Sequence, residues 1–468
     1  MHDDTLSWRA AYVNCRSHFI VVVLVVLAGC ADRPPEDGMA ALRTSVGARA
    51  GGDLVARPAT SERAAAKRET DILLAQELSL DASLKLALLN APRYQTLYAQ
   101  LGIAAAEQAS STALTNPVLS AMVRPTSNPA ALANLEFGIL TSLVDLLKRP
   151  ARGRAARGVF EAERLSVAAD VVAMALTVRT AYVDLVAATN IRDVQKELER
   201  AAAASAALAE RFHAAGNIPM VRLREEQAAA ADAALSLADA EMEAIEARER
   251  FALAVGIDAS LPWRVPAALP AAPKVPTPAV AGGIEQRLDV QASRAAASAA
   301  IGDLKLHSDW RLWREVGLDV SGERDGDGQW AIGPKLELAL PLFNQGRPDV
   351  ARAAAAAVRA DHQRASVEQA AAADLRLAQA RLGQAERRFV RYRDEIVPLH
   401  TEIVDLKLQE YNYMFVGVFE VLTARRAAAA SEVGYIGALR DFWKARLGLD
   451  AALGGGTALA LVNEDIAQ

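Results

Sequence analysis

Apolar and polar residues alternate along two short stretches of the chain. Between Gln329 and Leu340 the even-numbered positions are apolar, whereas the odd-numbered positions include Lys335 and Glu337. The stretch 135–143 alternates in the same way. A period of two is that of a β-strand, so both stretches are predicted to be strands with one apolar and one polar face. Such strands of about ten residues fit a membrane barrel with a wet lumen, and they fit equally a soluble hairpin packed on helices.

A helical period follows the strands. The stretch 160–215 contains neither Gly nor Pro, and Val171, Val178 and Leu185 recur in it at every seventh position. The positions interleaved with them are Val167, Met174, Ala181 and Ala188. This spacing is the a/d seam of a coiled coil, so the sequence predicts long antiparallel helices that pack along this seam.

The chain also repeats itself. The triplets at 143–145 (LVD) and 342–344 (LFN) lie 199 residues apart, and the stretches 211–223 and 410–422 show the same separation. Two anchors with one offset predict a duplicated structural unit. The expected organisation is a first repeat at 76–260, a Pro-rich connector at 261–283 and a second repeat at 284–455.

Each repeat is predicted to contain a helix, two strands and two long helices. The first helices are expected at Leu80–Gln108, with Asp81 as its cap, and at Ile284–Ser308. The strands are expected at Pro117–Arg124, Leu135–Leu143, Val316–Ser321 and Gln329–Leu340. The last helix of each repeat is predicted to end in a similar segment, Gly256-Ile257-Asp258 in the first and Gly448-Leu449-Asp450 in the second. These two segments lie only 192 residues apart. The difference of seven predicts that one heptad is missing from the second repeat.

The segment PLFNQGRPDV (341–350) joins a predicted strand to a predicted helix. Asn344 and Gly346 suit a tight turn. Pro348 and Asp349 suit the first turn of a helix, where proline is tolerated and an acidic residue faces the positive end of the helix dipole. Further along, Pro398 is expected to kink the helix that contains it.

The N-terminal region has the features of a bacterial lipoprotein signal. Residues 19–29 form an apolar run that is too short to span a bilayer as a helix and fits a signal peptide at 1–29. The run ends in Leu-Ala-Gly-Cys, which resembles a lipobox, so Cys30 is the expected site of lipid attachment. Ala31, rather than Asp, follows the cysteine, and by resemblance to the lipoprotein sorting pattern this favours the outer membrane. Residues 30–75 are expected to be a flexible tether, and 456–468 a C-terminal tail.

Composition and charge exclude several classes of function. The net charge of −5 and the lack of a Lys/Arg block argue against a nucleic-acid partner. No nucleophile elbow, P-loop or zinc-protease motif is present, so no enzymatic activity and no cofactor are expected. Four histidines would remain after signal removal (His213, His307, His362 and His400), and they lie on separate predicted elements, so no metal site is expected.

Four segments, by their order and duplication, resemble the TolC-type outer-membrane efflux family, especially its lipidated branch. These segments are LSLDASLKLALLNAP, PLFNQGR, FHAAGNIP and YNYMFVGVFEVL. The resemblance covers roughly residues 75–455. It implies a mainly α protein with a membrane β-barrel part, in which a homotrimer builds one 12-stranded barrel and an α-helical tunnel. It also implies that the far tips dock a periplasmic adaptor bound to an inner-membrane pump.

Carried onto this chain, the resemblance places the two tips at Ala215-Gly216-Asn217 and Val416-Gly417-Val418. At the offset of 199 the residue that matches Gly216 is Phe415, so the second tip departs from the first. Charged residues beside the tips could line or gate an aperture, or could be plain solvated coiled-coil charges. They are Arg224, Glu225, Glu420 and Arg425.

Three functions stay open at this point. The leading one is a passive exit duct of a tripartite efflux system that exports small molecules or metal ions across the outer membrane. The alternatives are a non-channel coiled-coil envelope lipoprotein or scaffold, and the outer-membrane component of a type I protein secretion system. The sequence does not identify the substrate.

Overall fold

The structure is a computed structural model of the chain, and the residues it describes are 42, 46, 63–125, 132–272, 283–313 and 316–454. The chain divides into two compact units, Met1–Asp37 and Gly38–Gln468, and every described residue belongs to the second. The predicted signal peptide 1–29, Cys30 and the tail 456–468 lie outside the described residues.

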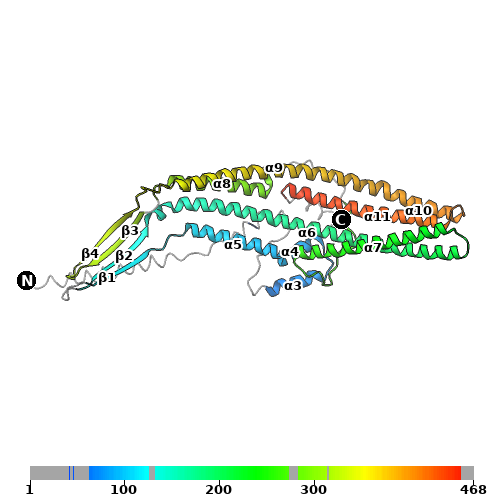
Figure 1. The fold of residues 1–468 in the computed structure, drawn as a ribbon, viewed down its shortest axis with the longest axis horizontal. Coiled ribbons are helices and arrows are strands. Elements are labelled where there is room, and N and C mark those ends of the chain that lie inside the picture. Colours follow the sequence, from blue (N-terminus) through cyan, green and yellow to red (C-terminus); the bar gives the residue numbers. More distant parts are fainter. Residues whose placement is uncertain are drawn as a thin grey trace, which may run out of the picture. The chain divides into compact units, whose positions relative to one another are not determined.

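The second unit is mainly helical and contains one small sheet (Figure 1). Its N-terminal half contains α3 (Arg63–Leu74), α4 (Leu80–Asn90), α5 (Pro92–Thr112), β1 (Val118–Arg124), β2 (Asn134–Ser142), α6 (Leu143–Ala214) and α7 (Met220–Val255). Its C-terminal half contains the short 3-10 helix η1 (Ile284–Gln286), α8 (Leu288–Asp309), β3 (Val316–Arg324), β4 (Trp330–Leu338), α9 (Arg347–Arg391), the π-turn η2 (Tyr392–Ile396), α10 (Val397–Asn412) and α11 (Val418–Ala452). The same order of helix, strand pair and long helices therefore occurs in both halves.

Helix α6 is the structural axis of this unit. It has 72 residues, which corresponds to about 108 Å at 1.5 Å per residue. It packs against α5, α7, α8 and α11, while α9 packs against α8 and α11. The predicted seam lies in the core, because Val171, Val178 and Leu185 are all buried. Small Ala residues along the same seam let the helices approach closely.

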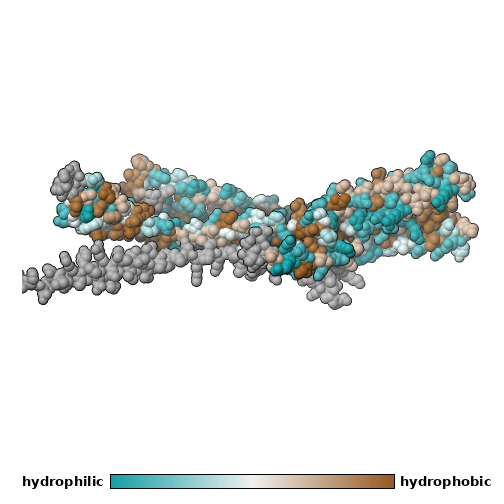
Figure 2. Space-filling view, turned by 90° about the horizontal axis from the view of Figure 1, so that it is seen from below, coloured by the Kyte–Doolittle hydropathy of each residue, from teal (hydrophilic) through white to brown (hydrophobic). Residues whose placement is uncertain are grey.

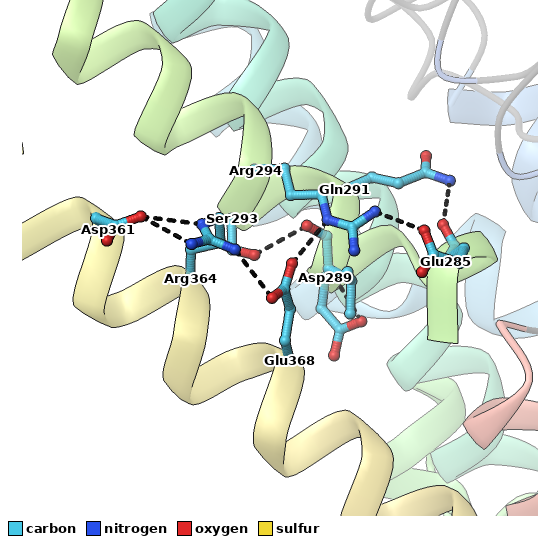
Figure 3. Close-up of polar contacts among 9 residues, drawn as sticks. Glu285, Asp289, Gln291, Ser293, Arg294, Asp361, Arg364 and Glu368 are labelled. Atoms are coloured by element: carbon cyan, nitrogen blue, oxygen red, sulfur yellow. Dashed lines mark hydrogen bonds and ion pairs between the residues drawn. The ribbon is translucent and has the colours of Figure 1, made fainter. Parts of the chain in front are cut away.

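An ion-pair network fastens α8 to α9 (Figure 3). Arg294 of α8 donates to Glu368 of α9 and to Glu285 of η1, each at 2.8 Å. Arg364 bonds the other oxygen of Glu368 at 3.0 Å and also binds Asp361. The hydrogen bond from Arg294 lowers the pKa of the Glu368 carboxyl below its ordinary value. The network sits at the surface and therefore fixes the register of the two helices more than it stabilises the fold.

The sheet has the order β1-β2-β3-β4, and every neighbouring pair is antiparallel. Three predicted strands agree with the observed ones to within two residues at each end. The exception is β3, which continues to Arg324 rather than ending at Ser321. Its last residues break the apolar alternation, but their backbones still pair with β2 and β4.

Three predictions at the start of the fold were wrong. The expected single helix Leu80–Gln108 is broken at Ala91, because Pro92 opens a new helix, and Ser79 rather than Asp81 caps α4. Residues 63–74, assigned to the tether, form α3. Asn90 of α4 donates a hydrogen bond of 3.0 Å to Thr70 in this helix.

The predicted loss of one heptad was also wrong. Gly448 lies inside α11, which continues to Ala452, and the left-handed residue after the helix is Gly454 with φ of 99°. The corresponding residue after α7 is Gly256 with φ of 78°. Helices α7 and α11 have 36 and 35 residues, so the last helices of the two halves match in length. The two similar Gly-containing segments do not mark corresponding positions, because Gly448 lies within a helix whereas Gly256 follows one.

The joint between β4 and α9 matches its prediction. Gly346 has φ of 72°, and its N–H donates to the Asn344 side chain at 3.0 Å. A Cβ at Gly346 would lie 2.9 Å from the carbonyl oxygen of Arg311, so both the backbone angle and the space require glycine. Pro348 and Asp349 lie in the first turn of α9. A kink was predicted at Pro398. The helix is interrupted close to this position, by the π-turn η2, which ends two residues before Pro398.

Part of the connector predicted at 261–283 packs on the helices. Trp263 and Leu269 are buried, and the Arg248 guanidinium lies 3.6 Å from the Trp263 ring centroid. Trp443 of α11 donates to the carbonyl of Pro270 at 3.0 Å. Residues 261–272 therefore hold the ends of α7 and α11 together.

Candidate functional site

One face of the sheet is apolar and open. The register places Ile139 of β2 between Leu119 of β1 and Val320 of β3. The exposed large apolar residues on this face are Leu119, Val123, Phe137, Ile139, Leu318, Val320, Trp330, Ile332, Leu336 and Leu338. Ile332 is 77% exposed and Leu336 is 65% exposed, and hydrophobic residues gather at the strand end of the view in Figure 2. A patch of this size marks a surface that contacts a membrane or another protein.

The opposite face of the sheet is charged. It carries four acidic residues and two basic ones, namely Glu136, Asp319, Glu323, Glu337, Arg124 and Lys335. Arg124 pairs with Glu136 at 2.8 Å and with Glu323 at 3.8 Å. Lys335 pairs with Glu337 at 2.6 Å. The alternation thus separates an apolar face from a polar one most clearly in β2, β3 and β4, whereas β1 also places the exposed Val118 and Met122 on the charged face.

Both edges of the sheet are available for pairing. β1 and β4 are the end strands, and within the described residues no other strand covers them. Edge strands present unpaired backbone donors and acceptors, which favour pairing with another chain. Since successive strands alternate in direction, β4 of one copy could pair antiparallel with β1 of the next.

The first predicted tip is the turn between α6 and α7. The N–H of Asn217 donates to the carbonyl of Phe212 at 2.8 Å, and the N–H of Gly216 donates to that of His213 at 2.9 Å. These two bonds form a Schellman motif around Gly216, whose φ is 76°. Ala215, Gly216 and Asn217 are all exposed, as a tip requires.

The second tip, between α10 and α11, has the same geometry with different residues. Phe415 donates to the carbonyl of Glu410 at 2.9 Å, and Met414 donates to that of Tyr411 at 2.9 Å. The left-handed residue is therefore Met414, with φ of 60°, and not Phe415 as the offset of 199 predicted. Tyr413, Met414 and Phe415 are among the most exposed large side chains in the described part of the chain.

The predicted second tip, Val416-Gly417-Val418, is displaced toward the returning helix. Gly417 is the N-cap of α11, and Val418 is its first residue. Pro219 holds the corresponding place before α7. The left-handed turn is formed by Tyr413, Met414 and Phe415. The prediction was displaced because it was centred on Gly417, which precedes the returning helix and is not the left-handed residue of the turn.

The four predicted aperture charges are exposed, and the structure does not bring them together. Glu225 pairs with Arg222 at 3.2 Å, and Arg224 donates to Gln227 at 2.8 Å. Glu420 and Arg425 lie on α11, and within the described part of the chain no ion pair joins any two of the four. Their positions are those of solvated charges on the helix surface.

A buried charge cluster near the tips was missed. Glu226 of α7 is only 2% exposed, and its carboxylate accepts hydrogen bonds from Arg426 of α11 at 3.0 Å and from Ser205 of α6 at 2.8 Å. Arg222 lies 3.3 Å away. Since Glu226 follows the buried Leu223 by three positions, it lies on the inward face of α7. A carboxylate at that spacing is the signal that could have revealed the cluster.

The remaining site predictions concern metals and membrane helices. Within the described ranges, no three His, Cys, Asp or Glu side chains gather as metal ligands would. Among these same residues, α6 alone is long and apolar enough by composition to cross a membrane, but 61% of its apolar window is buried inside the unit. This helix is therefore explained by its place in the core.

Comparisons with known proteins found solved structures that are similar to this chain. No family model and no curated protein matches the sequence. The structure of CusC, described in connection with transmembrane channel formation, is 16% identical, has a TM-score of 0.65 and matches 83% of this chain and 92% of its own. The outer-membrane channel OprN is 17% identical, has a TM-score of 0.66 and matches 83% of this chain and 92% of its own.

A third similar structure is the CmeC outer membrane channel of Campylobacter jejuni. It is 15% identical, has a TM-score of 0.62, and matches 86% of this chain and 89% of its own. These similar proteins are channels and not enzymes. The matches extend over most of the described helices and strands, and this chain therefore has the fold of the TolC-type outer-membrane channels.

Proposed function

We propose that the chain is one protomer of a passive outer-membrane exit duct. Three copies would close one 12-stranded barrel in the membrane, and their long helices would continue as a tunnel in the periplasm. The duct would do no chemistry and would lower the barrier for a solute to cross the outer membrane.

The sheet carries this proposal. Its exposed apolar face would be stable in lipid, and its charged face would be stable only in contact with water. Four strands with two open edges cannot remain alone in lipid, since each unpaired backbone group there costs several kcal/mol. The smallest membrane barrels have about eight strands, so copies must combine. Three copies would supply twelve strands that alternate in direction around the whole ring.

The helices support the second part of the proposal. Helix α6 starts directly after β2 and runs about 108 Å to the first tip, a length that carries the tips far from the membrane. The exposed turns around Gly216 and Met414 would dock a periplasmic adaptor, which would connect the duct to an inner-membrane pump. Acylation of Cys30 would tether the N-terminus to the same membrane. The solutes would be small molecules or metal ions delivered by the pump.

Labelling of adjacent residues tests the orientation of the sheet. Lys335→Cys lies on the polar face and Leu336→Cys on the apolar face of the same strand. We expect a membrane-impermeant maleimide to label Lys335→Cys in intact outer membranes, and we expect a lipid-borne quencher to reach only a probe at Leu336→Cys. Equal reactivity of both positions toward the impermeant reagent would show a soluble hairpin and favour the envelope scaffold.

Subunit counting and transport complete the test. In detergent we expect a mass of three copies, and we expect the Cys30→Ser variant to lose its lipid. A soluble Cys30→Ser monomer that needs no detergent would contradict the duct. In cells without the protein, selective accumulation of copper, cobalt or zinc would identify metal ions as the solutes, and accumulation of a fluorescent dye would identify small organic molecules.

A further inference from the structure

A row of small residues crosses the polar face of the sheet. Ser120 of β1 pairs with Gly138 of β2, Gly138 pairs with Ser321 of β3, and Ser321 pairs with Gly333 of β4. The row carries no long side chain and lies between two charged zones. On one side lie Arg124 and its acidic partners, and on the other lie Lys335 and Glu337.

Asp319 is directed into this row. Asp319 is only 9% exposed, and its buried Oδ1 atom has no hydrogen-bond partner among the residues that the structure describes. A Cβ built on Gly138 would lie 3.0 Å from Asp319 Oδ1 and 2.8 Å from Ser120 Oγ. A carboxylate from β3 and a hydroxyl from β1 therefore converge over the space that Gly138 leaves free.

The other charges of this face are already paired. Lys335 is the cross-strand neighbour of Asp319, but its ion pair within 4 Å is to Glu337 at 2.6 Å. Glu136 and Glu323 share Arg124. The charge of Lys335 also acts on Asp319 across the strand pair. The buried Oδ1 atom nevertheless lacks a hydrogen-bond partner among the described residues, and a bound cation would remove the cost of burying it.

We propose that Asp319, Ser120 and the space above Gly138 form a cation-binding position on the lumen face of the duct, and that this position makes the duct prefer cations to anions. The inference rests on the proposed function, in which the polar face lines the pore. Carboxylate and hydroxyl oxygens are the ligands that small hard cations prefer. The polar face carries a net charge of −2 per chain, which adds a field of the same sign.

The test is the reversal potential of single channels in a planar bilayer under a gradient of potassium chloride. For the native duct we expect a higher permeability for K⁺ than for Cl⁻. For Asp319→Asn we expect the ratio of the two permeabilities to fall by about twofold or more, because each of the three copies loses one carboxylate charge. Millimolar Mg²⁺ should reduce the current of the native duct and have less effect on the variant.

Two further variants separate a binding position from a diffuse charge effect. Glu323→Gln removes the same charge from the same strand and face, but its carboxylate is exposed and paired with Arg124, so its shift should be smaller. Gly138→Ala removes no charge and fills the space between Asp319 and Ser120, so it should lower the permeability ratio and the Mg²⁺ effect. If Asp319→Asn does not assemble, Gly138→Ala still tests the binding position.

Each outcome has one meaning. Equal shifts in Asp319→Asn and Glu323→Gln, with no change in Gly138→Ala, would overturn the binding position and leave only a general field. An anion-selective native channel would overturn it as well. Absence of any channel from a correctly assembled native protein would instead overturn the proposed function.

Discussion

At the scale of single residues, the two helical turns show how one backbone geometry can be built from different side chains. Both turns use the same pair of hydrogen bonds. In both, the residue whose N–H bonds the carbonyl three positions earlier is left-handed. The first uses Gly216, for which this conformation is free of strain, and the second uses Met414. The Met414 side chain is 92% exposed, so its contacts within the chain do not offset the strain.

Replacing Met414 by glycine should therefore stabilise the second turn. A left-handed conformation costs an ordinary residue about 1 kcal/mol, and Met414→Gly removes that cost without loss of buried area. We expect slower proteolytic cleavage at the turn or a higher melting temperature. Gly216→Ala in the first turn is the matched control and should have the opposite effect, although nothing lies within 4 Å of the added Cβ. A destabilised Met414→Gly would show that the side chain makes contacts that matter.

At the scale of elements, periodicity predicted the type and order of almost every helix and strand. It failed where the decisive interaction is not periodic. Gly448 looked like a helix end, but a glycine is tolerated inside a long packed helix such as α11. The break at Ala91 follows from Pro92 and could have been predicted from it.

The candidate site was predictable to a different degree in its different parts. The two faces of the sheet followed from alternation, because side-chain direction in a strand depends only on parity. The buried position of Glu226 and its contact with Arg426 could not be derived, since the two residues lie 200 positions apart and their pairing depends on how α7 packs on α11. Asp319 was missed for the same reason, because its surroundings come from β1, β2 and β4.

The Glu226 cluster is expected to hold the two helical hairpins together. Arg426→Ala would leave the carboxylate of Glu226 buried with one cation fewer, and breaking a buried pair in this way costs about 3 kcal/mol. We expect faster hydrogen exchange in 205–226 and 418–426. Arg425→Ala removes an exposed neighbouring charge and should leave the exchange unchanged to within about 0.5 kcal/mol. Glu226→Gln combined with Arg426→Ala should recover part of the loss, and equal exchange in all variants would exclude the cluster as a link.

At the scale of the whole molecule, apolar residues are used in two opposite ways. In the middle of α6 they are buried in the core, as Val171 and Val178 are. In the sheet the apolar side chains are exposed and the charged face is the one with ion pairs. A soluble protein would have no reason to expose such a sheet, but a membrane on one face and water on the other would stabilise both faces.

This inversion leads to a prediction about assembly that one pair of variants can test. Ile332→Arg places a charge on the apolar face, where it would meet lipid at a cost of about 2–4 kcal/mol per copy near the bilayer centre. Ala331→Arg places the same charge one residue earlier on the polar face, beside Glu323, where it would meet water. We expect Ile332→Arg to lose the assembled form from the outer-membrane fraction and Ala331→Arg to retain it, with assembly measured by native electrophoresis of detergent extracts. Because the effect is repeated in each copy, closure of a barrel should amplify a modest cost per chain into a clear loss. Equal assembly of the two variants would mean that the apolar face does not meet lipid, and the sheet would then be a soluble hairpin pair.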